Sequence, residues 1–455
     1  MFLCVGGEGP PIDGSAVVRS VHCNDAVELL PETGAIMLAL EHRFYGCHNV
    51  SACPVEGGVS SAADLKGLQS SHQALFDLAA FVEAMNAEYA LSADNLWISF
   101  GGSYPGMLAG WARTRFPHLI HGAVASSAPV RAEVDMRGYY DVLASAYAAE
   151  SAGGSSACVE AIRAGHAAIG KMMNGTDADR DLLASRFEEV PSGAWLEKID
   201  NQRDFAGDGV ADFPAQSNDP LCDADLCNIQ KICVLMTDKS VGDEVARLAA
   251  LANGQALAGV VGLHRPRRVR TRQASDKVGF SADDFWVWQT CTQFAFYQTC
   301  EHGSACPFTQ GLVSLSAMEE ACRSWGIDAK AVATNVALTN AFYGADRPAA
   351  PCRVLWPQGE VDPWKANGVD AAHLPCGQIG WEVTGASHHA WTHPSDPRDS
   401  PALKSARQAI WGNVTTWLQD AKGKGAEAER CGAETAHAAP SKLRQPAAAG
   451  VRATA

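Results

Sequence analysis

The chain has 455 residues, of which 47% are hydrophobic and 19% charged. This composition excludes a disordered or fibrous protein. The length suits one domain of about 250 residues and a second of roughly 150 to 200. The formal net charge of −15 argues against nucleic acid or an anionic membrane as the main partner, because both would repel the protein. No run of 18 or more apolar residues occurs, so we predict no membrane span.

Residues 1–134 alternate between predicted strands and helices. Helical spacing of apolar side chains marks 71–87. Short apolar runs predict strands at Phe2–Val5, Ala35–Leu40, Leu96–Phe100 and His121–Ala125. Alternation of this kind is typical of a parallel sheet covered by helices. We therefore predict that 1–134 is the first part of an α/β domain.

Between 135 and 333 helical spacing replaces the strand signal, for example at Cys158, Ile162, Ile169 and Met173. Most of the cysteines lie in this region, which predicts a disulfide-rich helical cap domain. A basic run at 265–272 could indicate nucleic acid, but in an anionic chain an exposed loop is the favoured interpretation.

Alternation returns after 350. We predict strands at Cys352–Pro357 and Ile379–Val383 and a helix at Ala402–Ala421, so that 334–423 forms the second part of the α/β domain. Residues 424–455 lack periodicity and are expected to be a disordered tail without a function.

Fifteen cysteines favour disulfides in an oxidising compartment. For Cys222, Cys227 and Cys233 disulfides are favoured over a zinc site. The odd number leaves at least one thiol unpaired, for which we expect Cys4 or Cys431.

Three glycosylation sequons, at Asn49, Asn174 and Asn413, also favour a lysosomal, vacuolar or secreted protein. The first residues contain no basic segment and no cleavage site of a signal peptide. We therefore expect an N-terminal truncation; residence in the cytosol is the alternative.

The strongest local motif is Gly101-Gly102-Ser103-Tyr104-Pro105-Gly106, between a predicted strand and a predicted helix. It predicts a nucleophile elbow, in which a tight turn exposes the Ser103 hydroxyl. Pro105 stands where the G-x-S-x-G pattern has its second glycine, although proline is tolerated in a first helical turn. The alternative is a strand-to-helix turn without chemistry.

A serine needs a base and a carboxylate that orients the base. Asp362 and His388 follow later strands in the order Ser, Asp, His. Glu360 is the rival acid and His389 the rival base.

The expected oxyanion hole combines the amide of Tyr104 with the loop after the first strand, at Gly7 and Glu8. A phosphate-binding loop is the alternative, but the lysine of such a loop is missing.

Several segments resemble the serine peptidase family that contains lysosomal Pro-X carboxypeptidase, dipeptidyl peptidase II and thymus-specific serine protease. The likeness extends to about residue 420. The segments are Gly6–Gly9, Leu40–Gly46, Gly101–Trp111, Ser126–Pro129, Trp288–Phe294, Gly359–Trp364 and Gly385–His389.

The resemblance implies an α/β-hydrolase fold with a helical cap and exopeptidase action next to proline, without a cofactor. It selects Ser103, Asp362 and His388 as the triad, and it places Met107 and Trp364 in a proline-accepting pocket, although both could equally be core residues. The partners are peptide substrates, cleaved by a carboxypeptidase or a dipeptidyl peptidase, and a homodimer is left open.

The chain departs from the family in two respects. Relatives carry a signal peptide and a further N-terminal strand region, and many continue Leu-Asp-Leu-Arg where this chain has Ala390–His393. The alternative functions are an esterase or lipase with the same triad and an inactive homologue that binds peptides. A zinc site at His389 and His393 is disfavoured, since no third ligand fits.

Overall fold

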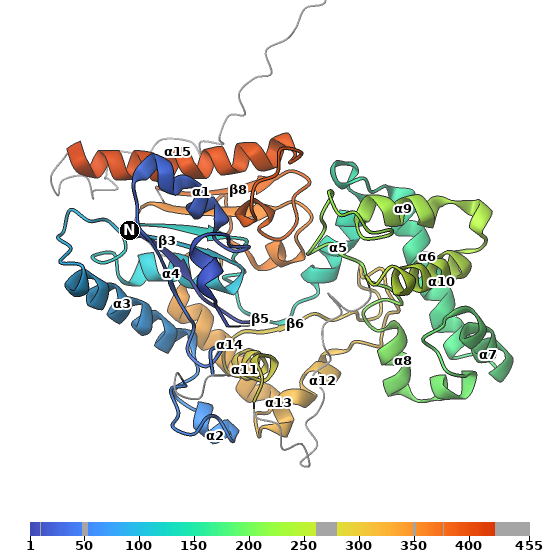
Figure 1. Cartoon of the computed structure of the whole chain (residues 1–455). Coiled ribbons are helices and arrows are strands. Elements are labelled where there is room, and N and C mark those ends of the chain that lie inside the picture. The colour runs from blue at the N-terminus through green and yellow to red at the C-terminus, as the bar shows by residue number, and fades with distance from the viewer. Residues whose placement is uncertain (10, 48–52, 261–279, 349–351, 376, 424–455) are drawn as a thin grey trace, which may run out of the picture.

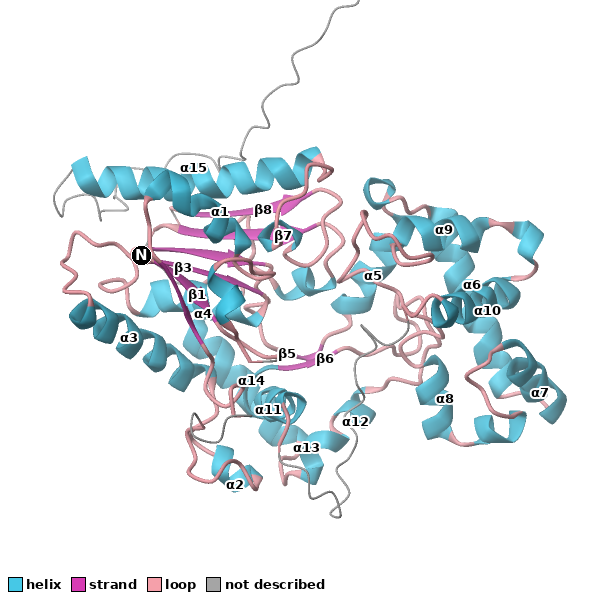
Figure 2. Cartoon of the chain, in the orientation of Figure 1, coloured by secondary structure: helices cyan, strands magenta, loops and turns pink. Residues whose placement is uncertain are grey.

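The computed structural model describes residues 1–9, 11–47, 53–260, 280–348, 352–375 and 377–423. Its largest sheet is parallel and has the strand order β2, β1, β3, β4, β7, β8 (Figure 1). Figure 2 shows these strands side by side in magenta. Their bounds are β1 Phe2–Val5, β2 Met37–Leu40, β3 Ile98–Gly102, β4 Gly122–Ser126, β7 Val354–Gly359 and β8 Gln378–Val383. The strands predicted from the sequence are confirmed, with small shifts at their ends.

Helices cover both faces of the sheet, as Figure 1 shows. The bounds of these helices are α1 Asn24–Thr33, α3 Ser71–Glu88, α4 Tyr104–Arg115 and α15 Pro401–Gly423. Alternate residues of β1 face opposite ways: Phe2 packs in the core under α1 and α15, and Leu3 packs in the core under α3 and α4. This arrangement confirms the predicted α/β class.

All strands of the sheet run in one direction, so their carboxyl ends lie along one edge. In open α/β sheets this edge is where ligands bind. The segments that the sequence marked for chemistry follow β1, β3, β4, β7 and β8 directly, and the topology therefore brings them together.

A second group of helices lies beside the sheet and has a core of its own (Figure 1). This outer helical cluster consists of α5 Gly138–Ala148, α6 Ser156–Met173, α7 Asp177–Arg186, α8 Ile199–Ala206, α9 Ile229–Thr237 and α10 Glu244–Leu257. Disulfides Cys158–Cys233 and Cys222–Cys227 lie within it, which confirms the interpretation of these cysteines.

Helix α14 packs on the helices that cover one face of the sheet. Val336 and Tyr343 of α14 belong to the core under α3 and α4, and the Tyr343 ring stacks on Trp111 of α4 at 3.6 Å between centroids. The remaining elements are α2 Ala62–Leu65, β5 Glu133–Asp135, α11 Ala282–Gln289, β6 Ala295–Tyr297, α12 Leu315–Met318, α13 Glu320–Ser324 and α14 Ala329–Tyr343. The domain boundaries near 134 and 333 stay a prediction.

One cysteine prediction is wrong. Cys4 forms a disulfide with Cys23, because the start of α1 lies against β1 with 5.9 Å between the two Cα atoms. Further disulfides are Cys47–Cys53, Cys291–Cys322 and Cys300–Cys306, and Cys352 is disulfide-bonded as well. Cys431, Asn49, the basic run and the tail after 423 lie outside the described residues.

No helix in the described part of the chain is long and apolar enough to cross a membrane. The same residues contain no group of three or more histidine, cysteine, aspartate or glutamate side chains that could hold a metal ion.

His166 gives the outer helical cluster a defined response to pH. The ring is fully buried; Nδ1 donates to the Ile162 carbonyl at 2.8 Å, and Nε2 accepts from the Val210 amide at 3.3 Å. The second bond requires the neutral ring, because a protonated Nε2 cannot accept, and burial lowers the pKa of His166 to about 4.

Because this pKa lies below the unfolded value of 6.5, the unfolded chain binds the proton first, and stability is lost as pH falls from 6.5 towards 4. We expect His166 to account for a loss on the order of 3 kcal/mol over that range. Denaturant unfolding at pH 7 and pH 4 should show a smaller loss in His166→Gln than in the wild type. His118→Gln, at an exposed histidine, is the control; equal losses in all three proteins would contradict the prediction.

Candidate active site

Ser103 occupies a strained turn between β3 and α4. Its backbone has φ 63° and ψ −133°, a conformation that costs a non-glycine residue free energy and is commonly kept at functional sites. The Ser103 amide donates to the Ser126 carbonyl at 2.9 Å, which anchors the turn to β4. The turn has the geometry predicted for a nucleophile elbow.

The glycines around Ser103 allow close backbone contacts. A Cβ on Gly101 would lie 2.4 Å from the Pro105 carbonyl oxygen, and one on Gly106 would lie 2.8 Å from the Ser126 carbonyl oxygen. Gly106 therefore lets α4 approach β4, and Pro105 occupies the first helical turn. The close contact that the second glycine of the pattern would allow is thus provided by Gly106, one residue later.

The predicted acid and base are in contact. His388 Nδ1 lies 2.8 Å from Asp362 Oδ2, and the other carboxylate oxygen accepts the Trp364 amide at 2.9 Å. Asp362 is fully buried. His388 Nε2 is buried and makes no hydrogen bond to a described residue, Ser103 included. Hydrogen bonds of this kind often form only when substrate is bound.

The two rival residues have other partners. Glu360 accepts the Ser151 hydroxyl at 2.7 Å and the Gly385 amide at 2.6 Å, so it holds the turn that precedes the histidines. His389 Nδ1 pairs with the Thr392 hydroxyl at 3.1 Å. A Cβ on Gly102 would lie 2.8 Å from the His389 ring, which explains the glycine before Ser103.

Ser126 and Ser127 join the serine turn to the histidine loop. Ser126 accepts the Ser103 amide through its carbonyl and the Trp391 indole through its hydroxyl, at 2.9 Å each. The Ser127 hydroxyl accepts the His389 amide at 2.9 Å. From the sequence, Ser126–Pro129 could be identified only as a segment shared with the family, without a role.

The segment that departs from the relatives, Ala390–His393, is supported from α15. Arg407 is buried, donates to the Trp391 carbonyl at 2.9 Å and pairs with Asp399 at 2.6 Å. The histidine loop also contacts the connection between α8 and α9 of the outer helical cluster, because the His388 amide donates to the Gln216 carbonyl at 3.0 Å.

The loop after β1 lies against the elbow. A Cβ on Gly7 would lie 2.3 Å from Pro105 Cγ, so Gly7 and the start of α4 are in direct contact. The Tyr104 amide is at the first position of α4, where a backbone N–H has no partner within the helix. An oxyanion hole at Gly7, Glu8 and Tyr104 stays a prediction.

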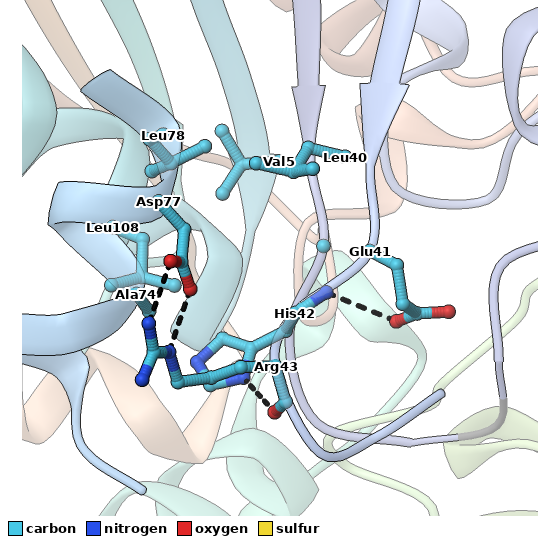
Figure 3. A pocket seen from close by; sticks show the side chains of 10 residues that line it. Val5, Leu40, Glu41, His42, Arg43, Ala74, Asp77, Leu78 and Leu108 are labelled. Carbon is cyan, nitrogen blue, oxygen red and sulfur yellow. Dashed lines mark hydrogen bonds and ion pairs between the residues drawn. The ribbon is translucent and has the colours of Figure 1, made fainter. Parts of the chain in front are cut away.

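The Tyr104 side chain is held by a buried network. Figure 3 shows His42 Nδ1 facing the Arg43 carbonyl, at 2.8 Å. Nδ1 therefore carries the ring proton, and Nε2 accepts from the Tyr104 hydroxyl at 2.8 Å. That hydroxyl accepts from Gln289 Nε2 at 2.9 Å, and Gln289 Oε1 accepts from Tyr45 at 2.6 Å. Two family markers, around His42 and Gln289, thus meet at the residue after Ser103.

We expect Tyr104→Phe to lower kcat by roughly 10- to 100-fold, because small displacements of groups in an active site have effects of this size. The variant leaves His42 and Gln289 each without one partner and removes the bonds that hold the Tyr104 ring, in the residue whose amide is predicted to bind the oxyanion. Tyr343→Phe is the matched control: it also removes a buried hydroxyl bond, to Ser71 at 2.8 Å, beside the same helix. Similar kcat values in the two variants would contradict a positioning role for the network.

A cavity of 1010 Å³ is lined by residues of α5 and α8 from the outer helical cluster and by residues of α11, β6, α12 and α13. Tyr139, Phe296 and Trp364 form an aromatic wall, with the Trp364 ring 5.5 and 5.4 Å from the other two and 6.4 Å from His388. Trp364 Nε1 donates to Gln216 Oε1 at 2.9 Å. Trp364 is thus the lining residue that lies beside His388; Ser103, Asp362 and His388 are themselves not among the residues that line the cavity.

Met107 occupies a different position from Trp364. It is fully buried in the core under α3 and α4 and is not among the residues that line the cavity. Its predicted contact with substrate stays a prediction.

Comparison with known proteins gives a consistent result. The family model for serine carboxypeptidase S28 matches residues 1–410. The chain is 33% identical to thymus-specific serine protease of Homo sapiens over 441 residues, which cover 93% of this chain and 80% of the relative. It is 23% identical to lysosomal Pro-X carboxypeptidase of Homo sapiens over 406 residues, covering 86% and 77%.

Proposed function

Because the chain belongs to the serine carboxypeptidase S28 family, and is thus a serine peptidase with an α/β-hydrolase fold, we propose that it is an exopeptidase that cleaves peptide bonds next to proline. Ser103 is the nucleophile, His388 the general base and Asp362 the acid that orients His388. The observation that supports this assignment most directly is the 2.8 Å contact between Asp362 and His388, at the same sheet edge as the strained Ser103 turn.

The reaction is acyl transfer. His388 Nε2 takes the proton of the Ser103 hydroxyl as its oxygen attacks the carbonyl carbon, and then gives that proton to the leaving amine. Asp362 fixes the proton of His388 on Nδ1 and stabilises the charged ring. The amides of Tyr104 and Gly7 bind the oxyanion. Water, activated by His388, then hydrolyses the acyl-enzyme.

Trp364 and its aromatic neighbours bind the proline ring. Flat aromatic side chains suit a pyrrolidine ring, which is apolar and rigid. The lysosomal Pro-X carboxypeptidase among the relatives acts, by its name, next to proline. With this relative and the several disulfides, we place the protein in the lysosome or outside the cell, where disulfides persist.

Two measurements test this function. A fluorophosphonate probe should label the folded protein at Ser103, and turnover should be compared for an Xaa-Pro amide, a blocked peptide ending in Pro-Xaa and a simple ester. Faster turnover of either proline peptide supports the exopeptidase, and dependence on a free amino group identifies a dipeptidyl peptidase. Preference for the ester would favour an esterase, and the absence of labelling would leave an inactive homologue.

A further inference from the structure

Gln216 contacts both the aromatic wall of the cavity and the histidine loop. Its side-chain oxygen Oε1 accepts from the Trp364 indole at 2.9 Å and from the Tyr139 hydroxyl at 3.0 Å. Its backbone carbonyl accepts the His388 amide at 3.0 Å. One residue of the connection between α8 and α9 is thus bonded to two aromatic residues that line the cavity and to the predicted base beside them.

The backbone of Gln216 is held from both sides. Phe213 and Ala215, just before it, are buried in the core of the outer helical cluster, and the Asp212 amide donates to Gln255 Oε1 at 2.9 Å. On the other side, the bond from the histidine loop holds its carbonyl. The residue itself is exposed and lines the cavity, so its side chain faces the cavity from a fixed backbone.

The hydrogen bonds determine how the Gln216 amide group is oriented. An indole N–H can only donate, so the atom 2.9 Å from Trp364 Nε1 is the amide oxygen. Nε2 lies on the opposite side of the amide group, and it makes no hydrogen bond to a described residue. The acceptor of this side chain is therefore occupied by the aromatic wall, and its two N–H donors are available to a ligand in the cavity.

The peptide bond that precedes proline matches this arrangement. Its nitrogen belongs to the proline ring and carries no hydrogen, so the bond offers a carbonyl acceptor and no donor. A side chain that presents only donors can bind this peptide bond without leaving a polar group of either partner unpaired. The carbonyl carbon is attached directly to the ring nitrogen, so a proline ring held by Trp364 places this carbonyl close to the ring.

We propose that Gln216 binds substrate, and that its Nε2 donates a hydrogen bond to the carbonyl oxygen of the residue that precedes proline. The inference rests on the proposed function, in which Trp364 and its aromatic neighbours bind the proline ring. Because this carbonyl does not react, the bond has the same strength in the substrate complex and in the transition state. It should therefore lower KM and leave kcat unchanged.

The test measures kcat and KM with two substrates. One is the better of the two proline peptides described above, both of which contain this carbonyl, and the other is its analogue with a thioamide at that position, because sulfur is a weak acceptor. We expect the wild type to have a KM roughly tenfold higher for the thioamide, with similar kcat.

Gln216→Glu keeps an oxygen that accepts from Trp364 and Tyr139 but has no N–H donor. Its KM for the oxygen substrate should rise roughly tenfold, and its preference for oxygen over sulfur should disappear. Gln298→Glu is the matched control, because Gln298 also lines the cavity and the substitution adds the same charge. This variant should retain the wild-type ratio of the two KM values.

Each failure has its own meaning. Equal KM values of the wild type for the two substrates, or an unchanged preference for oxygen in Gln216→Glu, would mean that Nε2 does not bind this carbonyl. A loss confined to kcat would assign Gln216 to the position of His388 alone and would also overturn the inference. Gln216→Met, which lacks a donor as well, replaces Gln216→Glu if the latter does not fold. If the wild type cleaves neither proline peptide, the proposed function itself fails, whereas normal turnover confines any failure to Gln216.

Discussion

Replacement of Ser103 by alanine is expected to lower kcat by a factor on the order of 10⁶, because removal of a nucleophile that acts as a unit with its base eliminates nearly all of the acceleration. The fold should be unaffected, since the hydroxyl makes no structural contact in the described residues and alanine fits the same turn. The measurement is hydrolysis of the best substrate, with fluorophosphonate labelling as a second readout.

Ser99→Ala is the matched control for this variant. Ser99 lies four residues earlier, on β3, is fully buried and donates to the Ala109 carbonyl at 3.1 Å. It should keep both labelling and turnover. If Ser103→Ala is labelled as strongly as the wild type, the nucleophile is a different residue and the triad assignment is wrong.

The second large effect is expected for Asp362→Asn, with a loss in kcat of about 10⁴-fold. An asparagine amide would donate to His388 Nδ1 and move the ring proton to Nε2, the atom that must accept the proton of Ser103. Because Asp362 is fully buried and also accepts the Trp364 amide, the substitution keeps the shape of the site. The check is kcat together with the unfolding temperature.

Glu360→Gln serves as the comparison, because Glu360 is the other acid of the same turn. Its contacts are with Ser151 and Gly385, so we expect a loss of stability and a much smaller change in kcat. A larger loss of kcat in Glu360→Gln than in Asp362→Asn would exchange the roles of the two acids.

The parts of the fold that could be predicted from sequence were those specified by short-range pattern. Buried strands gave apolar runs, and the elbow combined a strand, glycines and a serine within a few residues. The choice of Asp362 over Glu360 came from the resemblance. The structure adds a physical reason: Glu360 is engaged with the turn and Asp362 is in contact with His388.

Other features depend on contacts between distant segments. The pairing of Cys4 with Cys23 requires knowing that α1 lies against β1. The packing of α14 on α4 joins Tyr343 to Trp111, which are more than 200 positions apart in the chain. The roles of His42, Gln289 and Ser127 could not be predicted, because each makes its polar contact with a residue more than 60 positions away in the chain.

The contact between the His388 amide and Gln216 has a consequence for engineering. One could expect the sheet domain to be active by itself and the outer helical cluster to be a replaceable part that sets substrate preference. The backbone amide of His388, however, is hydrogen-bonded to Gln216, in the connection between α8 and α9 of the outer helical cluster. We therefore expect a chimera that takes its outer helices from a relative to change the position of His388 as well, and a variant without these helices and their connections to lose this hydrogen bond.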